Sequence, residues 1–219
     1  MRKVHKNAKF KLVDYIIIAL MASMGIGIKT IIVPLTQIIT SALFIPGGVL
    51  AGGFYMAFLV LGSAITKKPF TATLIALVQA VIVTITGTLG SHGAVSLLTY
   101  TLPGIAVDLL FFLLRSSGGS NLSCFFGGMV ANLVGSLAVN LAIFRLSFIP
   151  LILSLATAAL SGGLGGLIAS SIAKSVRKLG ILGEYVAEEE IEVEKEDKIN
   201  CEEKVESDDN GEKNENDEK

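Results

Sequence analysis

The amino-acid sequence predicts an all-α membrane protein, a bundle of six transmembrane helices followed by a disordered acidic C-terminal tail. The chain is 52% hydrophobic with a mean hydropathy of +0.67, whereas soluble domains are about 45–50% apolar. Its charge is segregated, because residues 1–183 carry 13 basic and 2 acidic side chains while residues 184–219 carry 5 and 17. The long apolar stretches lack the two-residue alternation of strands, which excludes a β-barrel.

A helix needs about 20 mainly apolar residues to cross a hydrocarbon core of about 30 Å. With charged residues and clusters of Pro, Gly and Ser as punctuation, the sequence predicts six such spans. They are residues 12–33, 41–66, 70–90, 94–115, 123–145 and 149–173. The sequence thus divides into a basic N-terminus (1–11), a transmembrane domain (12–183) and a tail (184–219). The tail is too charged and too poor in apolar residues to fold.

The distribution of basic residues predicts the orientation, since cytoplasmic ends of transmembrane helices are enriched in Lys and Arg. With a cytoplasmic N-terminus, the inside collects eleven basic residues: Arg2, Lys3, Lys6, Lys9, Lys11, Lys67, Lys68, Arg115, Lys174, Arg177 and Lys178. The outside keeps Lys29 and Arg145. We therefore expect a multi-pass protein of the cell membrane with both termini in the cytoplasm. A secretory signal peptide over residues 1–28 is disfavoured, because no convincing small-residue cleavage site follows its long apolar run.

Enzyme, metal and cofactor motifs are missing from the sequence. Cys124 and Cys201 are too few for a zinc site and are expected to be free thiols, and His5 and His92 are far apart. The sequence contains no Walker-type phosphate loop, no His-Glu-x-x-His and no Gly-x-Ser-x-Gly. We expect no catalytic activity, no metal and no cofactor, so any uphill transport would draw on an ion gradient or on partner subunits.

Small residues recur at helical spacing in the first and last spans. The last span carries Ala158, Gly162, Gly166 and Ser170 at every fourth position, and the first carries Ala19, Ser23 and Gly27. Such faces let two helix backbones approach closely in lipid. Packing inside the bundle is the favoured interpretation for the last span, whereas for the first a partner protein is equally favoured.

Polar residues form a stripe on each of three consecutive spans. These are Gln79 and Thr86, with His92 beyond the end of the span; Tyr100, Gly104 and Asp108; and Asn132, Ser136 and Asn140. Residues at i, i+4 and i+8 share a helix face, and buried polar groups in membranes are candidates for function. Facing one another, the stripes would line a small-molecule site with apolar walls and a few polar contacts. Hydrogen bonds that merely bridge helices are the alternative.

Depth along the helices sorts these polar residues into two sets. We predict that Gln79, Thr86, His92, Tyr100 and Asn140 contact a ligand, since they lie from the centre to the outer ends of their spans. Asp108 and Asn132 lie at matching depth in the inner half and form a predicted inner polar pair. A proton relay through Asp108 is disfavoured, because no second buried acid would receive the proton.

Four stretches of the sequence resemble the substrate-binding S components of energy-coupling factor (ECF) vitamin transporters, most of all those of the YkoE type, linked to the hydroxymethylpyrimidine part of thiamine. They cover residues 10–183 in order and read KLVDYIIIALMASMGIGIK, FIPGGVLAGGFYMAFLVLGSAITKKPFTATLIALVQAVIVTITG, TLPGIAVDLLFFLLR and LSGGLGGLIASSIAKSVRKLGILG. The Lys-Lys-Pro between the second and third spans and the Gly-rich last helix carry most of the resemblance.

The resemblance implies a six-helix protein that captures a vitamin-like molecule from outside. It would then dock on a transmembrane coupling subunit that carries two cytoplasmic ATPases. An Ala-x-x-x-Ala motif in the first helix meets the coupling subunit in that family, and Ala19 and Ser23 stand at its place. The chain departs from the YkoE-type pattern at Gln79 and Asn140, where acidic residues are usual, and it contains no Trp.

Two other classes of function stay open on the sequence alone. An ion-coupled secondary transporter would carry coupling-ion sites and usually inverted repeats with broken helices, and no convincing inverted repeat is visible. A non-transporting membrane scaffold would explain the small-residue faces without a ligand. Co-purification with two ATPases and a coupling subunit separates an S component from the first class, and stabilisation by a ligand separates it from the second.

Overall fold

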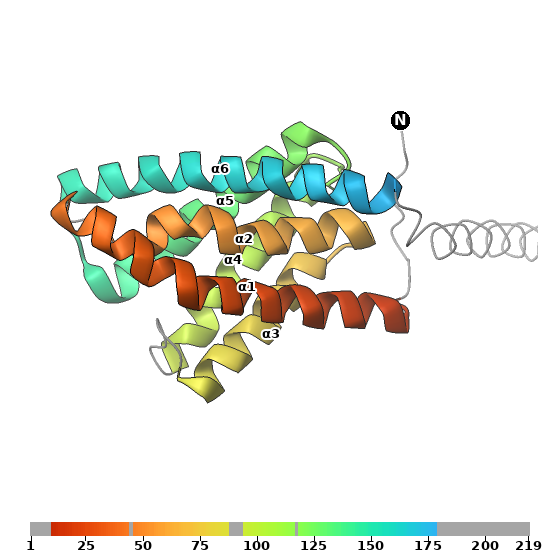
Figure 1. Cartoon of the computed structure of the whole chain (residues 1–219), viewed down its shortest axis with the longest axis horizontal. Helices are drawn as coiled ribbons and strands as arrows, with labels where there is room; N and C mark the ends of the chain where they lie inside the picture. The colour runs from red at the N-terminus through yellow and green to blue at the C-terminus, as the bar shows by residue number, and fades with distance from the viewer. Residues whose placement is uncertain (1–9, 44–45, 88–93, 117, 179–219) are drawn as a thin grey trace, which may run out of the picture. The chain divides into compact units, whose positions relative to one another are not determined.

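The computed structural model describes residues 10–43, 46–87, 94–116 and 118–178. The chain divides into two units, Met1–Ser175 and Val176–Lys219, and the helical bundle described here is the first (Figure 1). Every regular element within the described residues is helical, which confirms the predicted all-α class. The predicted acidic tail lies outside the described residues.

The described residues form six α-helices and two short helical turns. In chain order they are α1 (Leu12–Thr40), η1 (Ser41–Leu43), α2 (Gly47–Thr66), α3 (Thr71–Thr86), α4 (Ala94–Leu113), α5 (Asn121–Val139), η2 (Asn140–Phe144) and α6 (Phe148–Lys178). Five of them are long and apolar enough to cross a membrane. The exception is α3, whose 16 residues extend about 24 Å, less than the roughly 30 Å of the hydrocarbon core.

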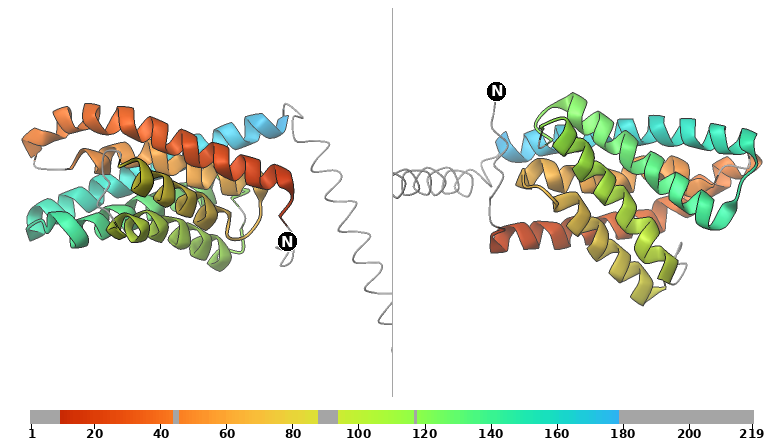
Figure 2. Two further views of the ribbon diagram at one scale, coloured as in Figure 1. Left: turned by 90° about the horizontal axis from the view of Figure 1, so that it is seen from below. Right: turned by 180° about the vertical axis from the view of Figure 1, so that it is seen from behind.

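Helix α2 is the central helix of the bundle. Of its most apolar 18-residue window, 67% is buried inside the protein, against 28–39% for the other long helices. α1 packs along α2, α3 along α4, and α4 along α5, and the α3–α4 pair runs obliquely to α1 and α6 (Figures 1 and 2). The outer helices expose large apolar side chains such as Ile38 at 77% and Ile149 at 79%. This is the surface expected of a bundle whose surroundings are lipid.

Helix α1 continues past Pro34 to Thr40, which corrects the predicted end of the first span at residue 33. Pro is tolerated within membrane helices because neighbouring groups satisfy the freed backbone. Two contacts fix the last two turns of α1 to the start of α2. The hydroxyl of Thr36 donates to the carbonyl of Gly47 at 2.9 Å, and the amide of Gly47 donates to Oε1 of Gln37 at 2.5 Å.

Bare glycine surfaces join α6 to α2 and α5. A Cβ on Gly165 would lie 1.8 Å from the carbonyl oxygen of Gly53, and one on Gly162 would lie 2.3 Å from that of Gly128. Two hydrogen bonds of Ser161 support the α2 contact, because its hydroxyl accepts from the amide of Gly53 at 3.1 Å and donates to the carbonyl of Leu50 at 2.5 Å. The small residues of α6 are therefore buried, which confirms internal packing for the last span.

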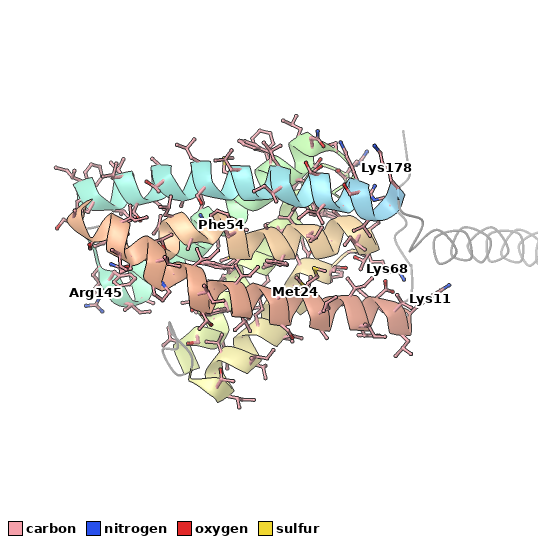
Figure 3. All side chains as sticks on the ribbon, in the orientation of Figure 1. Lys11, Met24, Phe54, Lys68, Arg145 and Lys178 are labelled. Carbon is pink, nitrogen blue, oxygen red and sulfur yellow. The ribbon has the colours of Figure 1, made fainter. Side chains whose placement is uncertain are left out.

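A buried ion pair joins the start of α1 to the connection between α2 and α3. Nζ of Lys68 lies 2.7 Å from Oδ2 of Asp14, and the two side chains are 2% and 0% exposed. The same carboxylate accepts from the amide of Lys11 at 2.8 Å. Figure 3 shows Lys11 and Lys68 at one end of the bundle and Arg145 at the opposite end. Lys11 and Lys68, both predicted to lie on the cytoplasmic side, are thus at the same end of the bundle.

Candidate functional site

Lys29 lies past the midpoint of α1, with its ammonium group between two tyrosine side chains. It donates a hydrogen bond to the hydroxyl of Tyr100 on α4. Its Nζ lies 4.1 Å from the ring centroid of Tyr100 and 5.4 Å from that of Tyr55 on α2. The distance to Tyr55 is within the range in which a cation is attracted to an aromatic ring, whereas the contact with Tyr100 is made through its hydroxyl group. The site therefore holds a partly buried cation against two tyrosines of the bundle.

Tyr55 is held in place by the start of its own helix. Its hydroxyl donates to the carbonyl of Gly48 at 3.1 Å, two turns earlier in α2. This hydrogen bond fixes the position of the Tyr55 ring, which lies close to Lys29. The tyrosine thus lines the site without using its own polar group on the cation.

Gln79 of α3 lies against the turn of α1 that precedes Lys29. The residue is 5% exposed, and its Nε2 is a buried donor with no hydrogen-bond partner among the described residues. A Cβ on Gly25 would lie 2.3 Å from that Nε2, so the amide packs directly against the backbone of α1 at this glycine. Four helices therefore bring Lys29, Tyr55, Gln79 and Tyr100 to two successive turns of α1. We call these four residues the Lys29 cluster.

The structure brings only some of the predicted ligand-contacting residues together. Gln79 and Tyr100 belong to the Lys29 cluster. Thr86 is exposed at the last residue of α3, with its hydroxyl donating to the carbonyl of Ile82 at 2.7 Å. Asn140 is buried, but its Oδ1 accepts from the amide of Leu146 at 2.9 Å, so its side chain secures the turn from η2 towards α6. His92 lies outside the described residues.

Asp108 and Asn132, the predicted inner polar pair, are not joined to each other. Oδ2 of Asp108 accepts from the amide and the hydroxyl of Thr73 at 2.7 and 2.6 Å. A carboxylate on these groups caps the first turn of α3, where backbone amides have no helical partner. Nδ2 of Asn132 donates to the carbonyls of Val49 and Ala158, both at 2.9 Å. Asn132 therefore bridges α2, α5 and α6, the role given above as the alternative for polar residues in the spans.

The small-residue stripe of α1 faces outward. Ala19, Ser23 and Gly27 are all exposed, and a Cβ on Gly27 would meet nothing within 4 Å. The hydroxyl of Ser23 donates to the carbonyl of Ala19 at 2.9 Å. The only polar side chain of the stripe thus forms its hydrogen bond within α1. The stripe is therefore a shallow and weakly polar part of the bundle surface.

Lys29 and Tyr55 were not among the residues that the sequence singled out. Lys29 lies within the first predicted span, residues 12–33, but was counted only as a basic residue of the outer side. An ionisable residue inside a membrane helix is itself a signal of function, and that signal was already present in the predicted span. Tyr55 carries no such signal, since a lone tyrosine in an apolar helix is most often a packing residue.

Within the described residues, no group of three or more His, Cys, Asp or Glu gathers as metal ligands would. The one thiol there, Cys124, is buried in α5 with its Sγ donating to the carbonyl of Gly118 at 3.2 Å. The chemistry of the cluster is thus that of a cation, an amide and two phenols.

Comparison with known proteins identifies a family that the sequence matches and a solved structure with a similar fold. The chain matches a protein family described as "ABC-type cobalt transport system, permease component" over residues 13–134, more than half of its length. No curated protein matches the chain. A crystal structure described as that of "an S-component of ECF transporter" is similar with a TM-score of 0.66 and 15% sequence identity, covering 85% of this chain and 98% of that one. The chain therefore belongs to the family of ABC-type cobalt transport system permease components, and its fold is that of an ECF transporter S component.

Proposed function

We propose that this protein is the substrate-capture subunit of an ECF-type ABC importer. It binds a small vitamin-like molecule from outside the cell and delivers it through a transmembrane coupling subunit driven by two cytoplasmic ATPases. The observation that carries this proposal is the S-component fold, which matches 98% of the solved chain, in a chain of a transport-permease family. The protein itself binds and presents the cargo, and its partners hydrolyse ATP.

The Lys29 cluster supports a cargo with a flat ring and polar substituents. Tyr55 and Tyr100 provide aromatic surface, and aromatic rings pack well against other rings. The amide of Gln79 offers a buried donor without a partner among the described residues, which a ring nitrogen or carbonyl would accept. A thiamine-related pyrimidine, the cargo class that the YkoE-type resemblance implies, has this chemistry. In our proposal Thr86, His92 and Asn140 remain additional ligand contacts, and Asp108 and Asn132 remain structural.

The exposed stripe of α1 supports docking on the coupling subunit. Ala19, Ser23 and Gly27 leave a shallow strip flanked by exposed apolar residues such as Ile16 and Leu20. A partner helix can approach such a strip closely, and close packing drives helix association in lipid. We assign the coupling-subunit contact to Ala19 and Ser23 on this ground.

Ala19→Leu or Ser23→Leu tests this assignment. Each is expected to weaken assembly with the coupling subunit and ATPases about 5- to 150-fold, because filling a close helix contact costs about 1–3 kcal/mol. Affinity can be measured by titrating the purified variant against the assembled coupling module in nanodiscs. Ala156→Leu, at an exposed position of α6, is the matched control and should assemble normally. Assembly of both α1 variants at parental affinity would remove the docking role from this stripe.

We also propose that both termini are cytoplasmic, as the basic residues at the Lys11 and Lys68 end indicate. An impermeant thiol reagent applied to intact cells should then label a cysteine introduced as His92→Cys and spare Cys201. Cys124 contributes no background, because it is 0% exposed. Labelling of Cys201 with protection of position 92 would reverse the orientation and the direction of uptake.

A further inference from the structure

We propose that the Lys29 cluster binds an anionic group of the cargo, a carboxylate or a phosphate, and that this charge defines the substrate class. The inference rests on the proposed function only in treating the bound molecule as cargo for import. It goes beyond the vitamin-like class by specifying the charge that the molecule carries where it meets the protein.

Within the part of the chain that the structure describes, Lys29 has no carboxylate partner. Asp14 and Asp108 are the only acidic residues in residues 1–183. Asp14 forms the buried ion pair with Lys68, and Asp108 is bound to Thr73 at the start of α3. Asp108 is also eight residues from Tyr100, about 12 Å along α4. Every acid of the transmembrane domain is therefore committed elsewhere.

The groups that do contact Lys29 stabilise a cation only partly. The Tyr100 hydroxyl and the Tyr55 ring attract the ammonium, but neither carries the negative charge that would neutralise it in the low-dielectric interior of the bundle. An ammonium has three donors, and Tyr100 accepts one of them. Polar residues buried in membrane proteins usually pair with one another, so an incoming anion would complete a set of contacts that the protein leaves open.

Gln79 adds a second donor on the same side of α1. Its Nε2 is buried with no acceptor among the described residues, and it lies against Gly25, one turn from Lys29. A cation on α1 and an unpartnered amide donor of α3, which lies against the preceding turn of α1, suit a group with two or three acceptor oxygens. Carboxylates and phosphates are such groups, and both accept charge-assisted hydrogen bonds from lysine.

The same positive charge selects against other cargo. Thiamine carries a fixed positive charge and would be repelled by Lys29, and uncharged hydroxymethylpyrimidine gains no ion pair. A phosphate ester of the pyrimidine, or a ring with a carboxylate, would satisfy both the ring surfaces and the ammonium. The cluster therefore points to an anionic member of the vitamin-like class.

Pairs of compounds that differ in one anionic group test the inference on the purified full-length protein. The probes are nicotinate with nicotinamide, pyridoxine phosphate with pyridoxine, and hydroxymethylpyrimidine phosphate with hydroxymethylpyrimidine, with thiamine as the cation. At least one anionic member should raise the midpoint of thermal unfolding, since a ligand that binds only the native state stabilises it. Its uncharged partner and thiamine should not.

Variants then connect the binding to the cluster. Titration calorimetry should show the stabilising anion binding about 10- to 100-fold more weakly to Lys29→Met than to the parent, because one charge-assisted contact is lost. Lys174→Met removes an exposed lysine of α6 and should bind like the parent. Gln79→Leu, which keeps the charge, should weaken binding about fivefold or more, and it carries the test if Lys29→Met does not fold.

Three results would overturn the inference: no anion of the set stabilises the parent, an uncharged partner stabilises it equally, or Lys29→Met and Gln79→Leu both keep the parental affinity. These failures are distinct from failure of the proposed function. A protein that assembles with the coupling subunit and ATPases but shows no preference for anions would still be a capture subunit. A protein that binds anions through Lys29 but never assembles would keep this inference and lose the importer role.

Discussion

Replacing Gly165 by alanine is expected to lower the free energy of unfolding by about 3 kcal/mol, the upper end of the usual cost of overpacking a close contact. The added Cβ would lie 1.8 Å from the carbonyl oxygen of Gly53. That oxygen belongs to the backbone of α2, so no side-chain rotation relieves the clash and α6 must move away from the central helix. The measurement is the midpoint of unfolding of the purified protein in detergent.

Gly27→Ala is the matched control for this change. Position 27 is also in a helix, but a Cβ there meets nothing within 4 Å. Alanine has the higher helix propensity by about 1 kcal/mol, so this variant should be as stable as the parent or slightly more stable. Equal stability of Gly165→Ala and Gly27→Ala would show that α6 does not pack on α2 through bare glycine.

Breaking the ion pair between Asp14 and Lys68 should produce the largest loss of stability among the side-chain changes. Removing one partner of a buried pair costs about 3–5 kcal/mol, because it leaves the other charge buried and uncompensated. Both side chains are almost fully buried, at 0% and 2% exposed. We therefore expect Asp14→Leu and Lys68→Met each to unfold at a markedly lower denaturant concentration than the parent.

The double variant Asp14→Leu with Lys68→Met separates lost charge from lost packing. Replacing both members of a buried pair by apolar residues of similar size is often neutral, so the double variant should regain most of the stability that either single change loses. A double-mutant cycle in which the two losses simply add would show that the two charges are independent. In that case the start of α1 is not fixed to the α2–α3 connection by this pair.

The helices could be predicted from the sequence because their signal is local. Apolar stretches bounded by charges and by Gly and Pro clusters predict α4 to within two residues, but α2 begins at Gly47 instead of residue 41 and α6 continues to Lys178 instead of residue 173. The prediction was wrong at the end of α1, because Pro34 has two opposite meanings. It terminates helices in water but is tolerated inside helices surrounded by other helices and lipid. The contacts of Thr36 and Gln37 with Gly47 decide between them, and they depend on the fold.

The site could be predicted only in part, because its polar residues are paired across helices. The sequence placed Gln79 and Tyr100 on neighbouring helix faces, but it could not show that α1 brings Lys29 to them. Helical spacing likewise put Asp108 and Asn132 at one depth without showing their true partners. Asp108 caps α3 through Thr73, and Asn132 bonds carbonyls of α2 and α6. Both outcomes depend on how the helices rotate about their axes, which spacing along one helix does not fix.

The most direct test of the capture-subunit proposal is native mass spectrometry of the tagged protein purified from the membranes of its own cells. Our account predicts a complex of this chain with one transmembrane coupling subunit and two ATPase subunits, together with a retained small molecule. The Ala19→Leu variant should lose the partner subunits and keep the small molecule. A chain that is recovered without ATPases, and whose uptake activity follows an ion gradient instead of ATP, would contradict the proposal.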